Sequence, residues 1–122
     1  MSMSEANKPG RDVPEEERVV LCGANSYGEK YYLNPRFSNL PKQIQDELKV
    51  MCVLYTNDVG GILLLEFDKD GYLHFRTEAT ENDTTYDEIG AVLKIKELQR
   101  SEEELLRSLE MYYRVLLANG LG

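Results

Sequence analysis

The sequence predicts an α+β domain in which an antiparallel sheet of about four strands packs against helices in two layers, in the order β-β-α-β-β-α-α. Two observations carry this prediction. Short β-branched and apolar runs occur in two pairs, and turn-forming residues separate the members of each pair. Apolar residues at helical spacing follow each pair. Because hairpins place strands side by side in opposite directions, the two pairs indicate one antiparallel sheet.

The chain of 122 residues has the usual size of one domain. Residues 1–17 are polar, contain Pro9, Gly10 and Pro14, and end in three glutamates. Such a segment cannot bury enough apolar surface to offset its chain entropy. We therefore expect a disordered lead-in over residues 1–17 and a single α+β domain over residues 18–122.

The first hairpin is predicted at residues 19–33. Residues 19–22 (VVLC) are apolar and end at Gly23, and residues 30–33 (KYYL) form a second strand-like run that stops at Asn34 and Pro35. The segment NSYG between the two runs supplies turn residues. These features together predict a hairpin with a rather long loop.

The first helix is predicted from about Pro41 to Gly60, because proline suits a first turn and glycine ends helices. Its apolar stripe has 4-3-4 spacing and consists of Ile44, Leu48, Met51 and Tyr55. Further apolar residues widen the stripe in the second half: Val50, Cys52, Val53 and Leu54. We therefore expect this half to be buried on nearly all sides, with another element covering its end.

The segment EFDKDGYLHF has two interpretations. With Gly71 at position 6 of a calcium loop, Glu66, Asp68 and Asp70 occupy positions 1, 3 and 5. Position 12 is then Thr77, which cannot chelate as a glutamate does, and strand-like runs flank the segment on both sides. Asp-Gly between two apolar strands favours a hairpin turn, although weak cation binding by the three carboxylates stays open.

The strand predicted before this turn has apolar residues on both faces. Leu63, Leu65 and Phe67 can share the core face, whereas Ile62 and Leu64 point the other way. These two side chains need cover from another element or from a partner chain.

Two C-terminal helices are predicted from two capping boxes, Thr85 with Glu88 and Ser101 with Glu104. A continuous helix over residues 85–118 would be about 50 Å long. Because that length exceeds what a compact monomer of this size can cover, we expect a break near Arg100. The alternative, one unbroken helix, would favour a dimer.

Composition excludes several functions. The net charge is −8, which makes nucleic acid and anionic membrane surfaces poor partners.

Cys22 and Cys52 both lie among apolar neighbours, which favours buried free thiols in a reducing cytoplasm over a structural disulfide. His74 is the only histidine, and phosphate-binding glycine motifs and zinc signatures are absent from the sequence. We expect a non-enzymatic cytoplasmic protein without a cofactor or metal.

Three stretches taken together resemble an uncharacterised family of short cytosolic proteins from Gram-positive anaerobic bacteria. They are VVLCGANSYGEKYYLN, ELKVMCVLYTNDVGG and SLEMYYRVLL. The resemblance covers roughly residues 18–117. It implies a bacterial, cytoplasmic setting and brings no activity or site residues with it.

The sequence therefore favours a non-enzymatic protein-interaction module or a homodimer. The candidate interface residues are apolar or aromatic: Ile62, Leu64, Tyr31, Tyr32, Tyr112 and Tyr113. An alternative is a small-ligand sensor, with Tyr72, His74 and Arg76 on one strand face as polar contacts. A third hypothesis, a cryptic enzyme, would have to use His74.

Overall fold

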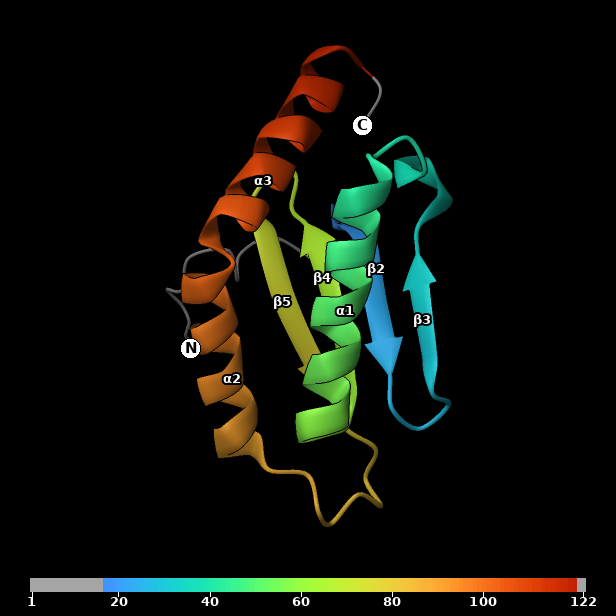
Figure 1. The fold of residues 1–122 in the computed structure, drawn as a ribbon, viewed down its shortest axis with the longest axis vertical. Coiled ribbons are helices and arrows are strands. Elements are labelled where there is room, and N and C mark those ends of the chain that lie inside the picture. The colour runs from blue at the N-terminus through green and yellow to red at the C-terminus, as the bar shows by residue number, and fades with distance from the viewer. Residues whose placement is uncertain (1–16, 121–122) are drawn as a thin grey trace.

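The computed structural model describes residues 17–120 and confirms the predicted fold class and element order (Figure 1). The elements are β2 (Val19–Asn25), β3 (Lys30–Leu33), the 3-10 helix η2 (Pro35–Phe37), α1 (Lys42–Val59), β4 (Ile62–Phe67), β5 (Leu73–Glu78), α2 (Glu88–Ser101) and α3 (Glu103–Ala118). The predicted lead-in, except for Glu17, lies outside the described residues.

The four strands form one antiparallel sheet in the order β3-β2-β4-β5. Strand β4 joins the two hairpins, because it pairs with β2 on one side and with β5 on the other. The β2–β4 register shifts between Val20 and Cys22, as at a β-bulge. Leu21 and Cys22, although adjacent in the sequence, are both fully buried.

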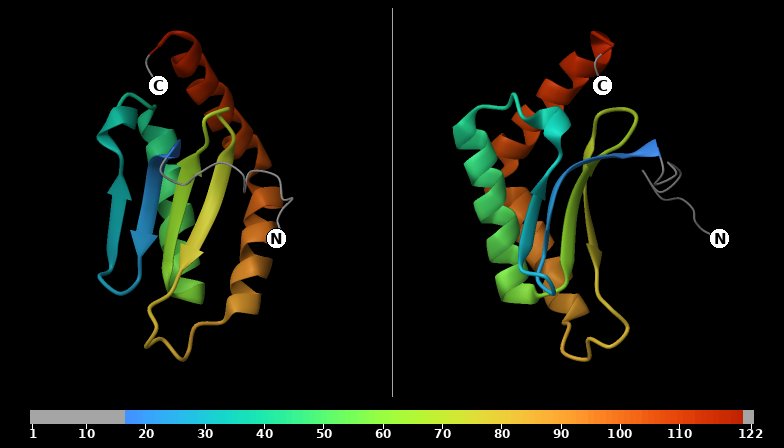
Figure 2. Two further views of the ribbon diagram at one scale, coloured as in Figure 1. Left: turned by 180° about the vertical axis from the view of Figure 1, so that it is seen from behind. Right: turned by 90° about the vertical axis from the view of Figure 1, so that its right-hand side faces the viewer.

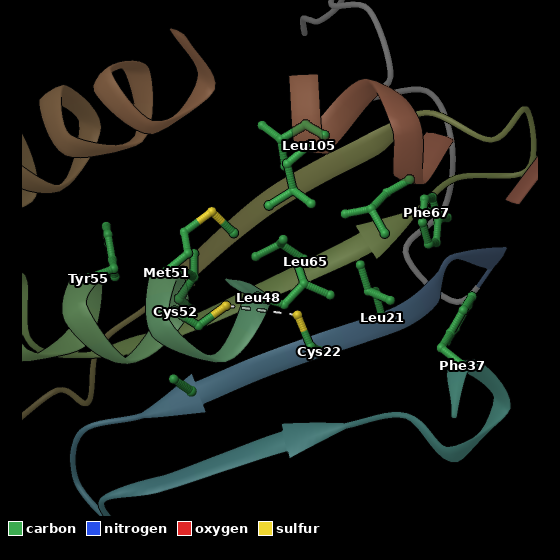
Figure 3. Packing of buried hydrophobic residues seen from close by; sticks show 14 of the residues in the cluster. Leu21, Cys22, Phe37, Leu48, Met51, Cys52, Tyr55, Leu65, Phe67 and Leu105 are labelled. Carbon is green, nitrogen blue, oxygen red and sulfur yellow. Dashed lines mark hydrogen bonds between the residues drawn. The ribbon is translucent and has the colours of Figure 1, made fainter. Parts of the chain in front are cut away.

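Within residues 17–120, the three α-helices all lie on one face of the sheet, and no helix of this range covers the other face (Figure 2). The core lies between these layers, and it includes Leu48, Leu65 and Phe67 (Figure 3). At one end of the core, the rings of Phe67 and Tyr113 stack with centroids 4.2 Å apart. This contact fixes α3 to β4.

The predicted turn between β4 and β5 is confirmed. Its ends are closed by the Asp68 N–H, which donates to the Tyr72 carbonyl at 2.9 Å, and by the Gly71 N–H, which donates to the Asp68 carbonyl at 3.0 Å. Gly71 has a φ of 90°, a conformation that glycine adopts readily because it has no Cβ. The segment is therefore a hairpin turn rather than the loop of an EF-hand.

Burial of the second half of α1 was predicted wrongly. Val50 and Leu54 are 56% and 54% exposed. One side of α1 packs on the sheet through buried residues such as Leu48 and Cys52. Helix α2 approaches a flank of α1 and does not cover its outer side, so an apolar strip stays in solvent.

Both predicted capping boxes were wrong, although the predicted break between the last two helices is confirmed. Asp83 accepts a hydrogen bond from the Thr85 hydroxyl at 2.8 Å, and helix α2 starts three residues after Thr85. Asp87 caps α2 by accepting from the Gly90 N–H at 2.9 Å. Ser101 is still inside α2. The helical conformation is interrupted one residue later, at Glu102, where φ is −109° and ψ is 23°.

Candidate functional site

A groove of about 840 Å³ lies between α1 and α2. Its apolar lining residues are Val50, Met51, Leu54, Tyr55 and Leu98. Val50 and Leu54 are four residues apart on α1 and therefore lie one above the other on the same side of the helix. The groove thus contains apolar surface that the fold itself does not cover.

The rim of the groove is mainly acidic. Its charged residues are Asp46, Glu47, Asp58 and Glu102, together with Lys42 and Lys94. Both lysines are near carboxylates, since Lys42 Nζ lies 2.8 Å from Asp46 and Lys94 Nζ lies 3.4 Å from Asp58. The rim as a whole therefore presents an excess of negative charge.

The groove continues towards α3. A second hollow of about 300 Å³ shares Glu47 and Glu102 with the first and adds Ile44, Glu104 and Leu105. The two hollows follow α1 along most of its length, from Lys42 to Asp58. An elongated shape of this kind suits an extended or helical segment better than a compact molecule.

Tyr55 lines the groove with a fully buried ring. Burial, and after it the neighbouring Tyr86 hydroxyl, raises the pKa of Tyr55. The hydroxyl groups of both tyrosines are buried without a well-formed hydrogen bond to any residue in the described part of the chain. Tyr55 therefore contributes a fully buried phenol, next to that of Tyr86, to the wall of the groove.

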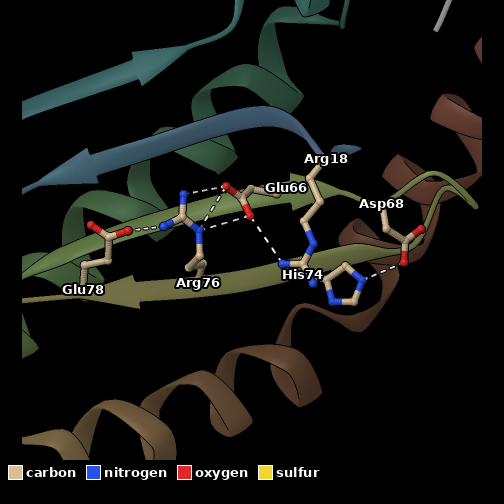
Figure 4. A network of polar contacts seen from close by, with 6 residues as sticks. All are labelled: Arg18, Glu66, Asp68, His74, Arg76 and Glu78. Atoms are coloured by element: carbon tan, nitrogen blue, oxygen red, sulfur yellow. Dashed lines mark hydrogen bonds and ion pairs between the residues drawn. The ribbon is translucent and has the colours of Figure 1, made fainter. Parts of the chain in front are cut away.

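The face of the sheet away from the helices carries a network of charges (Figure 4). Glu66 is buried there, and Arg76 donates to both of its oxygens, with Nε 3.2 Å from Oε1 and Nη2 2.8 Å from Oε2. Arg18 lies 3.4 Å from the same carboxylate, and Glu78 pairs with Arg76. These contacts connect strands β4 and β5 with the residue that precedes β2.

His74 and Asp68 form a separate pair at one end of this face, with Nε2 2.7 Å from Oδ2. The other Asp68 oxygen accepts hydrogen bonds from the backbone N–H groups of Asp70 and Tyr72 at 2.9 and 3.0 Å. The Asp68 carboxylate therefore organises the turn. Among the described residues, no group of three or more His, Cys, Asp or Glu side chains could hold a metal ion.

The structure distributes the predicted interface residues over different places. Tyr32, Ile62 and Leu64 lie together on the helix-free face and line a hollow of about 320 Å³ with Gly23. Tyr31, which also lines this hollow, packs partly against the core, as does Tyr112. Tyr113 is buried within the core. A partner for the Tyr32, Ile62 and Leu64 cluster stays a prediction.

The predicted ligand contacts already have partners within the chain. His74 pairs with Asp68, and Arg76 pairs with Glu66 and Glu78. The Tyr72 ring lies under the Arg114 guanidinium, whose carbon is 4.4 Å from the ring centroid. A ligand that used these three side chains would have to compete with those contacts.

A family model described as "Family of unknown function (DUF6145)" matches residues 18–120. The chain belongs to this family. The predicted membership of an uncharacterised family is thus confirmed, whereas the bacterial and cytosolic setting stays a prediction. No curated protein and no solved structure matches the chain. Within the described residues of this DUF6145 member, every helix is too short or too polar to cross a membrane.

Proposed function

We propose that this protein is a non-enzymatic interaction module that binds an amphipathic helix of a partner protein in the groove between α1 and α2. The observation that carries the proposal is the strip of exposed apolar surface at Val50 and Leu54 inside a groove with an acidic rim. The partner helix would place apolar residues in the groove and basic residues beside the rim.

The apolar part supports a helical partner. Helices that bind in grooves use apolar anchors at i, i+3, i+4 and i+7, and these anchors need a long apolar strip on the receiving protein. Val50 and Leu54 supply two such contact points one helical turn apart, and Leu98 lines the groove from α2. Burying one leucine-sized side chain contributes about 1.5–3 kcal/mol.

The charged part supports a basic partner. Four carboxylates and two ammonium groups surround the groove, so lysine or arginine on the partner would meet complementary charge. Such complementarity mainly speeds association and selects the partner, while the apolar contacts slow dissociation. The two features together describe a basic amphipathic helix.

A labelled model peptide tests the proposal directly. The peptide carries leucine at helical i, i+3, i+4 and i+7 positions and lysine elsewhere, and binding is followed by fluorescence anisotropy. A peptide of the same composition, with leucines scattered around the helix, controls for charge alone. We expect Leu54→Ser to weaken binding of the amphipathic peptide by about tenfold or more.

Val115→Ser on α3 is the matched control, because Val115 is similarly exposed but lies outside the groove. This variant should bind the peptide as the wild type does. Equal binding of the two peptides, or equal effects of Leu54→Ser and Val115→Ser, would contradict the proposal.

A small-ligand sensor is the second candidate. It is favoured by the volume of the groove, which falls in the range of ligand sites, and by the Tyr55 phenol in its wall, whose hydroxyl lacks a well-formed hydrogen bond within the described residues. Thermal-shift screening of a metabolite library against the wild type and Tyr55→Phe would support it through a hit that the variant loses. A flat response across the library would remove it. In either case we place the protein in the bacterial cytoplasm, in line with its two free buried thiols.

A further inference from the structure

Helix α2 carries a second exposed apolar surface, separate from the groove. Ile89, Val92 and Leu93 are 75%, 54% and 61% exposed, whereas Ala91 is the only fully buried residue of this helix. The spacing of i, i+3 and i+4 places the three side chains on one face of the helix. Figure 1 shows α2 at the margin of the fold that lies opposite β3.

A charge pattern surrounds this face. Glu88 lies four residues before Val92 and Lys96 lies four residues after it, so the three side chains follow one line along the helix. Glu88 and Lys96 are about 12 Å apart along the axis, which is too far for them to pair with each other. Both are exposed, and neither has an ion-pair partner among the residues that the structure describes.

We propose that this face of α2 pairs with the same face of a second copy of the chain, with the two helices antiparallel and Val92 near the two-fold axis. In that arrangement Glu88 meets the partner's Lys96, and Lys96 meets the partner's Glu88. Ile89 and Leu93 then cover apolar surface on either side of the axis. The interface is isologous, as in most homodimers.

The charge pattern decides the direction of pairing. A parallel pair would bring Glu88 against Glu88 and Lys96 against Lys96, which like-charge repulsion disfavours. The antiparallel pair also places the positive end of each helix dipole beside the negative end of the other. Because one helix face is smaller than the roughly 800 Å² per partner of a standard interface, the dimer should be weak and concentration-dependent.

This dimer does not depend on the groove. The groove is lined from α2 by Lys94 and Leu98, whereas Ile89, Val92 and Leu93 do not line it. The two proposals can therefore fail separately.

Sedimentation equilibrium over a wide range of protein concentration tests the dimer. We expect the wild type to show a reversible monomer–dimer equilibrium. Val92→Glu should weaken the dimer by about 100-fold, because it places two like charges near the axis. Lys96→Glu should weaken it by about tenfold, because each Glu88 then faces another carboxylate.

The double variant Glu88→Lys/Lys96→Glu provides the decisive measurement, because exchanging the two charges preserves the antiparallel match. We expect it to recover most of the affinity that Lys96→Glu loses. Val115→Glu, an exposed change on α3, should dimerise as the wild type does. Thermal melts followed by circular dichroism check that each variant is folded.

Three results would overturn the dimer. One is a wild type that stays monomeric at the highest concentration reached, and another is a dimer that Val92→Glu leaves unchanged. The third is a double variant as weak as Lys96→Glu. If the chain is monomeric yet binds the amphipathic peptide, the groove proposal survives and the dimer proposal fails.

Discussion

The Sγ atoms of Cys22 and Cys52 lie 3.8 Å apart in the core, where strand β2 meets helix α1 (Figure 3). Both cysteines are free thiols and both are fully buried. The hydrogen bond with Cys22, together with burial, raises the pKa of the Cys52 thiol. Since the thiolate is the reactive form, the fold protects Cys52 from electrophiles.

We therefore predict that iodoacetamide does not label Cys52 in the native protein at pH 8. Labelling should become complete in guanidinium chloride, and intact mass spectrometry counts the modified thiols. Cys22→Ser and Cys52→Ser assign the signal to each position. Full labelling of the native protein within minutes, or a native mass two hydrogens lower than that of the reduced chain, would contradict this prediction.

Buried tyrosines predict a loss of stability at alkaline pH. Burial raises the pKa of Tyr31, Tyr55 and Tyr113, with the neighbouring cysteines adding to the effect at Tyr31 and Tyr86 adding to it at Tyr55. In the unfolded chain these phenols titrate near pH 10. The unfolded state therefore loses protons first as pH rises, and the free energy of unfolding falls.

Urea unfolding at pH 8, 9, 10 and 11 measures this effect. Full stability should persist below about pH 9 and decrease through the range where unfolded tyrosine ionises. The matched variants are Tyr55→Phe, which removes one buried phenol, and Tyr32→Phe, which removes an exposed one. Tyr55→Phe should flatten the decrease more than Tyr32→Phe, and equal slopes for the two variants would refute the explanation.

The hairpin turn was predictable because its signals are local. Asp70 and Gly71 specify a tight turn wherever they occur between apolar strands. The helix starts were less predictable, because Thr85 and Asp87 are both good caps. Only the structure shows that the Thr85 hydroxyl donates to Asp83, and that Asp87 is the residue that caps the N-terminus of α2.

The groove could not be predicted, because it depends on where α2 lies relative to α1. An apolar residue at helical spacing has the same sequence signal whether a neighbour covers it or not. Val50 and Leu54 were therefore expected in the core, and Tyr113 was a candidate for an interface as well as for the core, where it stacks on Phe67. Tertiary packing decides whether each of these side chains is exposed or buried. The spacing of apolar residues along the sequence contains no information about that packing.

The hydrogen bonds that the Asp68 carboxylate accepts lead us to predict a loss of stability at acid pH. Burial acts to raise the pKa of its carboxyl group, but hydrogen bonds from His74 and from the N–H groups of Tyr72 and Asp70 outweigh burial and lower the pKa. The unfolded carboxyl titrates near pH 3.9, so the unfolded state takes up the proton first as pH falls. The stabilisation is complete above that value and is lost as pH falls through the lower, folded pKa.

Asp68→Asn should cost about 1–3 kcal/mol at neutral pH, because buried hydrogen-bond donors lose their charged acceptor. The cost should shrink as pH falls below about 4, because the unfolded wild-type chain then takes up a proton that the folded carboxylate resists, and the stabilisation by this carboxylate is lost. Asp70→Asn is the control, since Asp70 is exposed in the same turn. A cost for Asp68→Asn that does not change between pH 3 and 7 would show that charge is not the cause.

The two carboxylates that Arg76 contacts should differ greatly in their contribution to stability. The Glu66 side chain is 4% exposed and that of Glu78 is 48% exposed, although both are ion-paired with Arg76. Removing the charge of a buried carboxylate from an ion pair costs about 3–5 kcal/mol, because the guanidinium group loses its buried charged acceptor. Removing one partner of an exposed pair costs about 0–1 kcal/mol.

Urea unfolding of Glu66→Gln and Glu78→Gln compares the two positions with the same chemical change. We expect a large loss of stability for Glu66→Gln and almost none for Glu78→Gln, at equal ionic strength. Raising the salt concentration should reduce the small effect at Glu78 and leave the larger one nearly unchanged, because water and ions reach only the exposed pair. Equal losses at the two positions would mean that burial does not set the strength of these contacts.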